Sequence, residues 1–362
     1  ILMKIRDRYI AKTLLTSTFT VLVVWVSIYS FFNLLAELNS VGKEGYTILS
    51  ALKYIALQLP QVAYNQASPV ILLGCIIGMG HLATTGQLLI FRVSGASILK
   101  ITSITLKNSL IFVFFFISIG EFLAPISSNF AENSRSDAIG NSSTSASQNG
   151  FWIRDGGNFI NVKRNIDGIL FSGITVIEVN SSNKIERVIK SEDAIFDGNS
   201  VDMTYSEIFS IDESNSFEGI SLKERNTYDK TVSFDQDLID SLIKEPEDLS
   251  TWTLFKQIRF LTDNKLRSGV FEVELYKRLV QPITLVAMIL LAMLFIFGSS
   301  RDVTLGRKIF FGIALGLSFE MLSRVASAMA LSMNFSPLLS SILPSIVVMF
   351  ISIILLLKKS SS

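Results

Sequence analysis

Glu320 and Arg324 stand four positions apart inside a long apolar stretch near the end of the sequence. Helical geometry puts such a pair on one face, where carboxylate and guanidinium can meet. Charged side chains are costly in lipid, and they normally face a bundle interior or a water-filled cavity. The pair is therefore a candidate lining of a substrate path, with Arg324 meeting a phosphate or carboxylate. An ion pair that only fixes helix packing is an equal alternative.

The rest of the sequence gives little indication of an enzymatic active site. One histidine, His81, and one cysteine, Cys75, are too few for the usual metal sets or nucleophile–base pairs. The sequence contains no G-x-x-x-x-G-K-[ST] phosphate loop. We therefore expect a non-catalytic chain that binds no cofactor, for which a partner hydrolyses ATP.

A short segment between two apolar stretches, His81–Ser97, carries a single arginine among apolar residues. A soluble partner could grip a short helix of this kind. The candidate contact residues are Gln87, Leu88, Phe91 and Arg92. The alternative is an ordinary amphipathic helix on the membrane surface.

The composition places these residues in a membrane protein. Of 362 residues, 49% are hydrophobic, and the mean hydropathy is +0.47, which is too apolar for an ordinary soluble protein. A spanning helix needs about 20 predominantly apolar residues. Six segments qualify: Leu14–Phe32, Val62–Ala83, Ile101–Leu123, Val280–Phe297, Ile309–Leu331 and Leu338–Leu357.

The basic residues predict that both termini are cytoplasmic. Lysine and arginine gather before the first span, around the connection after the second, after the fourth and behind the sixth. Short cytoplasmic loops retain such bases. The opposite connections are poor in them, and Ser332–Ser336 has no charge at all. The polar region between the third and fourth spans is therefore predicted to lie outside.

That polar region, residues 131–267, shows the alternating pattern of β-strands bounded by turns, as in "GILFSGITVIEV". Short strands without intervening helices predict a sandwich or jelly roll whose inner face could hold an apolar ligand. A linker over Asn141–Asn149 and a short amphipathic helix over Leu249–Leu266 are expected to flank it. The aromatic residue Phe159 could line an acyl-chain groove, although filling a core is the commoner role.

The predicted fold class is a polytopic α-helical membrane protein with six transmembrane helices and an inserted β-jellyroll domain. Residues 1–130 form the first three spans and a short helix near 84–96, and residues 268–362 form the last three. Glycines recur four apart at Gly74 and Gly78, and again at Gly312 and Gly316. This spacing lets helices approach closely, for packing or for a sliding gate.

Several motifs in this order resemble the LptF/LptG (YjgP/YjgQ type) family of lipopolysaccharide-export permeases, and the LptG type most closely. The resemblance covers essentially the whole chain. The matching strings are "DRYIAKT" (7–13), "LLIFRVSGAS" (88–97), "GEFLAP" (120–125), "GFWIRDGGNFI" (150–160) and "QPITLVAMILLAMLFIFGSSRDVTLGRK" (281–308).

The resemblance implies a heterodimer with a homologous LptF-type permease in the Gram-negative inner membrane. A cytoplasmic LptB-type ATPase dimer, which binds ATP and Mg²⁺, would power it. Lipopolysaccharide would be extracted sideways and handed to a periplasmic bridge of LptC type and then LptA type. The residues alone leave open a different class of function, a membrane-anchored sensor or assembly scaffold with a ligand-binding outer β-domain.

The resemblance also implies roles for particular residues. The helix near 84–96 would dock on the ATPase, and Gln87 stands where the family has an acidic residue. The first and fifth spans would line a lateral gate, with bases near the outer end of the first span meeting phosphorylated sugars. The candidate path residues are Phe32, Asn33, Lys43, Phe159, Glu320 and Arg324, and Lys43 is the only base in the stretch after the first span.

Overall fold

The computed structural model describes residues 5–43, 45–139, 151–155, 157–166, 170–180, 184–198, 200–211, 220–232, 245–264, 266–298, 305–333 and 335–361. The expected linker Asn141–Asn149 lies outside these residues. The chain forms two compact units. The first comprises Ile1–Ala36, Ile55–Ser128 and Glu272–Ser362, and the second comprises Glu37–Tyr54 and Asn129–Phe271.

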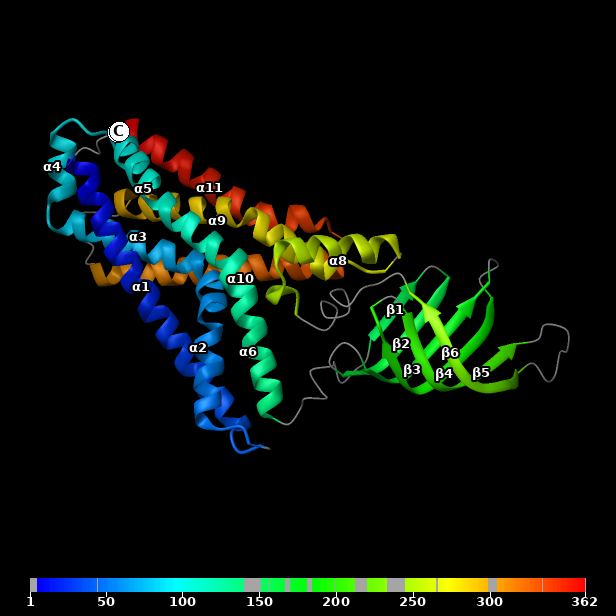
Figure 1. The fold of residues 1–362 in the computed structure, drawn as a ribbon. Coiled ribbons are helices and arrows are strands. Elements are labelled where there is room, and N and C mark those ends of the chain that lie inside the picture. The colour runs from blue at the N-terminus through cyan, green and yellow to red at the C-terminus, as the bar shows by residue number, and fades with distance from the viewer. Residues whose placement is uncertain are drawn as a thin grey trace. The chain divides into compact units, whose positions relative to one another are not determined.

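The first unit is a bundle of long helices (Figure 1). Within the described residues, six helices are long and apolar enough to cross a membrane, which confirms the six predicted spans. They are α1 (Ile5–Glu37), α3 (Ala67–Thr84), α5 (Ile98–Ser118), α9 (Gly269–Gly298), α10 (Leu305–Ser332) and α11 (Pro337–Ser361). Helix α5 continues through a π-helical turn, η2 (Ile119–Leu123), into α6 (Ala124–Ala138). Two further helices are α2 (Ile48–Asn65) and α4 (Gln87–Val93).

The second span begins later than the hydropathy pattern predicted. The pattern begins at Val62, but α2 ends at Asn65 and α3 begins at Ala67. Gln66 breaks the helix with φ −97° and ψ 11°. Its side-chain oxygen accepts a hydrogen bond from Trp25 Nε1 of α1 at 3.1 Å. The break therefore joins α1 to the start of the second span through a polar contact.

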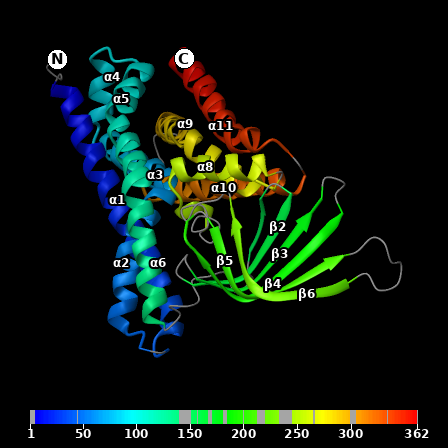
Figure 2. The same cartoon turned by 45° about the vertical axis from the view of Figure 1, so that its right-hand side comes forward.

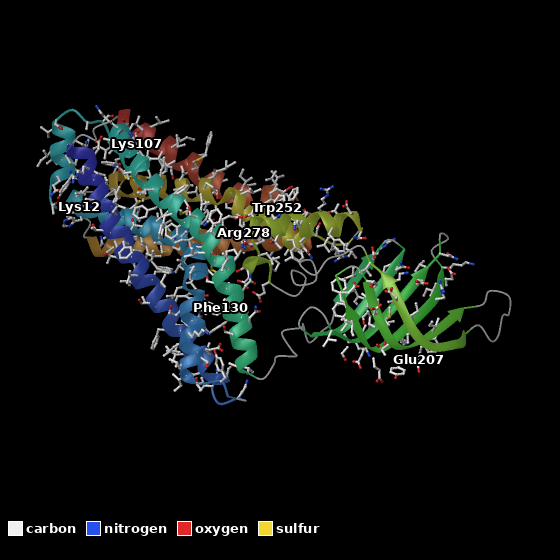
Figure 3. The ribbon with its side chains drawn as sticks, in the orientation of Figure 1. Lys12, Lys107, Phe130, Glu207, Trp252 and Arg278 are labelled. Carbon is white, nitrogen blue, oxygen red and sulfur yellow. The ribbon has the colours of Figure 1, made fainter. Side chains whose placement is uncertain are left out.

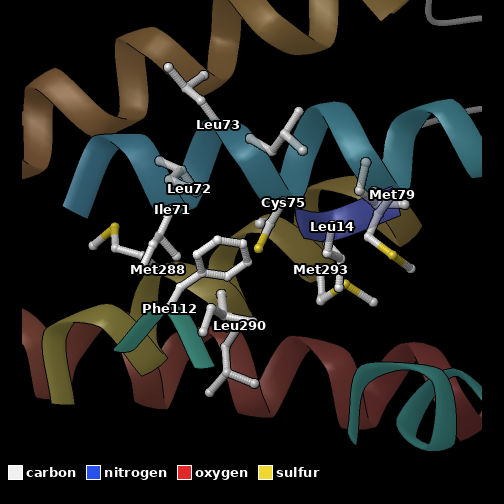
Figure 4. Packing of buried hydrophobic residues seen from close by; sticks show 14 of the residues in the cluster. Leu14, Ile71, Leu72, Leu73, Cys75, Met79, Phe112, Met288, Leu290 and Met293 are labelled. Carbon is white, nitrogen blue, oxygen red and sulfur yellow. The ribbon is translucent and has the colours of Figure 1, made fainter. Parts of the chain in front are cut away.

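Helix α3 lies at the centre of the hydrophobic core of the first unit. Ile71, Cys75 and Met79 are buried, and they belong to the same cluster as Phe112 of α5 and Met288 of α9. Figure 4 shows these side chains packed together around Cys75. Nearly every position of α3 is buried, so it behaves as the core helix of this unit.

Glycines bring two other helices close to α3. A Cβ added at Gly74 would lie 2.7 Å from the Cα of Thr18, which places α1 directly against α3. On another side, a Cβ added at Gly312 of α10 would lie 3.1 Å from Leu73, and one at Gly316 would lie 3.5 Å from Leu72. Gly74 of α3 therefore contacts α1, and Gly312 and Gly316 of α10 contact α3. Both predicted small-residue pairs thus belong to helix contacts in which α3 takes part.

The second unit contains a six-stranded antiparallel sheet in the sequential order β1 to β6. Figure 2 shows that this sheet is curled. The predicted β-domain is confirmed, and its described strands form a single half-barrel meander. The strands are β1 (Phe151–Asp155), β2 (Asn158–Ile166), β3 (Leu170–Val179), β4 (Ile185–Phe196), β5 (Ser200–Ile211) and β6 (Ile220–Thr231).

Strand alternation buries one face of the curled sheet. Ile160, Phe171 and Val176 belong to an apolar cluster that extends from β1 to β5 and includes Val232. An ion pair between Lys230 of β6 and Glu178 of β3 also joins strands that are not neighbours in the sheet. The curl therefore brings distant strands together over the buried face.

A short 3₁₀ turn, η3 (Pro246–Asp248), and helix α8 (Thr251–Asp263) follow the sheet. The Ser250 side chain caps α8 by accepting a hydrogen bond from the Thr253 amide at 3.2 Å. The amphipathic helix predicted over Leu249–Leu266 is thereby confirmed.

Candidate functional site

The segment predicted to meet a soluble partner forms α4, a helix of seven residues between two glycines. Gly86 and Gly95 have φ values of +76° and +85°, in the left-handed region that side chains other than glycine rarely adopt. The backbone therefore turns sharply at each end of α4. These two turns fix the direction of the helix relative to α3 and α5.

The side chains of α4 divide into an inner and an outer face. Leu88 is 5% exposed and Phe91 is half-buried, and both pack with the core of the first unit. Arg92 is exposed, next to the apolar side chains of Leu89 and Ile90, which are 54% and 65% exposed. The predicted residues thus have different places: Leu88 and Phe91 hold the helix to the bundle, and Arg92 faces outward.

Gln87 begins α4 and is half-buried. Its Oε1 atom is buried and has no hydrogen-bond partner among the residues that the structure describes. A buried amide oxygen without a partner carries a desolvation cost.

The predicted pair in the fifth span forms an ion pair in α10. Arg324 Nε lies 3.2 Å from Glu320 Oε1, and the two side chains are 72% and 31% exposed. Leu317 and Met321 lie on the same face of the helix and are 49% and 67% exposed. The charges therefore lie on an outward apolar face and not inside the bundle of this chain.

The C-terminal part of α1 presents large apolar side chains. Phe31 and Phe32 are 58% and 63% exposed, with their rings in edge contact at 5.8 Å between centroids. Asn33 is half-buried. Phe32 is thus exposed on the surface of this chain, and its place on a substrate path stays a prediction.

In the second unit, a polar cluster forms around the last residue of α1. Arg135 Nε of α6 donates a hydrogen bond to Glu37 Oε1 at 2.7 Å, and its guanidinium lies 5.4 Å from the ring of Tyr54. The Tyr54 hydroxyl donates to Glu132 Oε1 at 2.6 Å. Burial, and then the hydrogen bond to Glu132, raise the pKa of Tyr54 well above its usual value. Burial and Glu37 raise the pKa of Tyr46 to about 12.

The second unit contains bases that sequence spacing did not reveal. Lys43 is exposed in the turn after α1, where its carbonyl accepts a hydrogen bond from the Tyr46 amide at 2.8 Å. In the same unit, Arg135 comes from α6 and Lys53 comes from α2, with Lys53 Nζ 5.0 Å from the ring of Phe130. Lys43 is therefore not the only base available to an anionic ligand here. Arg135 is a basic residue in the last turn of α6, "APISSNFAENSRSDA", and this was the feature of the sequence from which a further base could have been predicted.

Phe159 lies on β2 between residues whose side chains face the buried side of the sheet. Its neighbour Ile160 is 1% exposed and belongs to the apolar cluster, so Phe159 points to the opposite face. Its ring lies 5.2 Å from the Arg154 guanidinium. A lipid that followed the buried face would meet Phe171 and not Phe159.

A buried polar group in the first unit was not predicted. Arg278 of α9 is 7% exposed, its Nε lies 3.6 Å from Glu274 Oε1, and its guanidinium lies 5.8 Å from the ring of Tyr64. The Tyr64 ring in turn packs against Gly120 in the π-helical turn. Figure 3 labels Arg278 on α9. Such turns are frequent at functional positions, and this one joins α2, α5 and α9.

The comparisons with known proteins agree with this architecture. The family model described as lipopolysaccharide export system permease LptF/LptG matches residues 8–358. The lipopolysaccharide export system permease protein LptG of Escherichia coli K12 is 28% identical over 363 residues, covering 98% of each chain. The LptG protein of Haemophilus influenzae is 27% identical over 342 residues, covering 94% of each. The chain, whose described residues include six apolar helices long enough to span a membrane, is a multi-pass inner-membrane protein and belongs to the LptF/LptG family of lipopolysaccharide export permeases.

Proposed function

We propose that this chain is the transmembrane permease subunit of an ABC transporter that extracts lipopolysaccharide from the inner membrane and passes it toward the outer membrane. Its partners are a homologous LptF-type permease, an LptB-type ATPase dimer that binds ATP and Mg²⁺, and a periplasmic β-jellyroll bridge of LptC type and then LptA type. Both termini are cytoplasmic and the β-domain is periplasmic. The chain itself binds no cofactor and catalyses no reaction.

The exposed apolar faces of α1 and α10 support this proposal most directly. Large exposed apolar surfaces are covered by lipid or by a protein partner. Both helices also contact α3 through glycines, so they rest on a surface that allows close approach and small displacements. The exposed side chains are Phe19, Val23, Val24, Ile28, Tyr29, Phe31, Phe32 and Leu35 on α1, and Phe310, Leu317, Met321, Leu322, Val325 and Met329 on α10.

The ion pair on α10 gives this surface a polar element. A charged pair facing hydrocarbon would be costly, so a face that carries Arg324 is better suited to a cavity between subunits. In this cavity Arg324 would bind a phosphate or carboxylate of the lipid, and Glu320 would hold the guanidinium between cycles. The outer bases Lys43, Lys53 and Arg135 would bind further phosphates as the lipid leaves.

Helix α4 provides the connection to the ATPase. Its outer face, with Leu89, Ile90 and Arg92, would lie in a groove of the ATPase, and Leu88 and Phe91 would transmit displacement to the core around α3. Because Leu88 and Phe91 pack with this core, the helix would move together with the bundle.

The experiment that tests this function is site-specific photocrosslinking in cells that make lipopolysaccharide. A photoreactive residue replaces Phe32 on α1 or Met321 on α10, which are 63% and 67% exposed. Matched controls on the same helices replace Val21 and Phe319, which are 9% and 6% exposed. We expect ATPase-dependent lipopolysaccharide crosslinks at Phe32 and Met321 and none at the controls. Absence at both exposed positions in an assembled complex would contradict the proposal and favour a sensor or scaffold.

A further inference from the structure

One face of α8 is exposed in the described part of the chain and carries both aromatic rings and bases. Trp252 and Phe255 are 66% and 52% exposed, and their rings stack with centroids 6.3 Å apart. Lys256 and Arg259 are also exposed, and they follow Trp252 by four and seven positions. This spacing puts all four side chains on one face. Figure 3 labels Trp252 on this helix.

The opposite face of α8 already has a structural role. Leu254, Gln257 and Leu261 are buried, and Phe260 packs against the apolar cluster of the sheet. The fold of the second unit therefore fixes the rotation of α8 about its axis. The face with Trp252 and Phe255 is left outward, and the packing of its own unit does not explain those two aromatic residues.

The chain keeps α8 close to a membrane span. Helix α8 ends at Asp263 and α9, a candidate span, begins at Gly269. The intervening residues 264–268 can extend over roughly 20 Å at most. This connection includes two more bases, Lys265 and Arg267. The apolar part of the fourth span begins at Val280, so 16 residues, 264–279, separate it from the end of α8 and limit the distance of α8 from the membrane surface.

The residues around α8 carry a local excess of positive charge. Between positions 256 and 267 there are four bases, Lys256, Arg259, Lys265 and Arg267, and one acidic residue, Asp263, whose carboxylate lies 3.9 Å from Arg259 Nε. Long outer loops cross the membrane largely regardless of their charge, so the orientation of the chain does not account for these bases. An anionic surface is a partner that their charge fits.

We infer that α8 lies on the outer surface of the inner membrane and binds its phospholipid headgroup layer. Trp252 and Phe255 enter the interface, where aromatic residues with apolar bodies are favoured. Lys256 and Arg259 bind phosphates of anionic phospholipids. The inference rests on the proposed function in one respect only, which is the assignment of α8 to the outer side of the membrane.

Tryptophan fluorescence of the full chain in lipid nanodiscs tests this inference. The three tryptophans are Trp25, Trp152 and Trp252, so two Trp→Phe changes leave a single reporter. Trp152 on β1 is the matched control, because it lies in the same unit and is 57% exposed against 66% for Trp252. We expect brominated lipids to quench Trp252 by about half. Trp152 should respond to aqueous iodide and not to brominated lipid.

The charge dependence is tested in the same nanodiscs, without lipopolysaccharide. Raising the fraction of phosphatidylglycerol should increase the quenching of Trp252, and the double variant Lys256→Gln, Arg259→Gln should abolish that increase. Lys163→Gln, at an exposed position of β2, should leave it unchanged. Quenching of Trp252 by iodide and not by brominated lipid would overturn the inference. Shielding of Trp252 only when the partner permease is added would also overturn it, in favour of a protein contact. Neither result depends on lipopolysaccharide transport, so a failure of this inference can be distinguished from a failure of the proposed function.

Discussion

Helices α3 and α1 are both long and apolar, yet they pack in opposite ways. In the most apolar window of α3, 78% of the residues are buried, against 6% in the corresponding window of α1. Hydropathy does not separate them, because lipid and a protein core favour the same side chains. The glycines of α3 and its position among α1, α5, α9 and α10 make it the core helix. Helix α10, at 17%, resembles α1.

Thiol labelling gives the largest expected difference between the two helices. Cys75 of α3 is 1% exposed, whereas Phe32 of α1 is 63% exposed. A cysteine at Phe32→Cys, in a Cys75→Ala background, should react with a maleimide roughly 100-fold faster than Cys75 in the native chain, because the buried thiol must wait for local opening. The measurement is the labelling rate in detergent. Similar rates would show that α3 is not the packed core, and labelling in denaturant provides the control.

Overpacking at the contact between α1 and α3 should be the next largest effect. An alanine at Gly74 would place its Cβ 2.7 Å from the Thr18 Cα and against its hydroxyl. We expect Gly74→Ala to destabilise the chain by about 1–3 kcal/mol, as seen for overpacked cores. The matched control is Gly306→Ala, because a Cβ added at Gly306 would meet no neighbouring atom within 4 Å. Thermal unfolding of both variants in detergent measures the difference, and equal stabilities would contradict the close contact.

The outward face of α10 is tested by separating the two charges of its ion pair. Arg324→Gln should lower lipopolysaccharide export about tenfold if the guanidinium binds a lipid phosphate, since one charge-assisted hydrogen bond is lost. Glu320→Gln should have a smaller effect, because Arg324 can still bind the phosphate. Transport in a reconstituted system measures both. Equal losses for the two variants, accompanied by equal destabilisation, would identify the pair as a packing device.

The smallest expected effect is on the pH dependence of the polar cluster at the end of α1. The raised pKa values of Tyr46 and Tyr54 mean that the folded chain keeps protons which the unfolded chain loses above pH 10. Stability from this cluster is therefore fully present below pH 10, and it falls as the pH rises toward 12. Ultraviolet difference spectra should show tyrosines that titrate late. Tyr54→Phe should remove one of them, because Tyr54 is the residue whose hydroxyl donates to Glu132.

Much of the architecture could be predicted from the sequence. Six apolar runs correspond to the six long helices, and the alternating region between the third and fourth corresponds to the sheet, because both patterns are periodic over many residues. The break at Gln66 was not predicted, and the hydrogen bond that its side chain accepts comes from Trp25, 41 positions away in the sequence. The hydropathy pattern predicted one continuous span from Val62 and therefore gave no sign of the break.

The candidate site was less accessible to prediction. The spacing of Glu320 and Arg324 indicated an ion pair, and the structure contains it, because neighbours four apart on a helix meet whatever surrounds them. The sequence did not predict which side of each helix faces outward. Leu88 and Phe91 were grouped with Arg92, although the bundle core holds the first two, and Phe159 was chosen although the register turns it away from the buried face.

By itself, the sequence determined the number of apolar helices, the β-domain between them, the local ion pair and the membership of a permease family. All of these depend on the order and spacing of residues along one stretch of chain. Only the tertiary structure decided that α3 is the core helix, that Arg135 pairs with Glu37 at the C-terminal end of α1, and which faces stay exposed. Those features depend on contacts between segments far apart in the chain, and hydropathy along one segment carries no information about its neighbours.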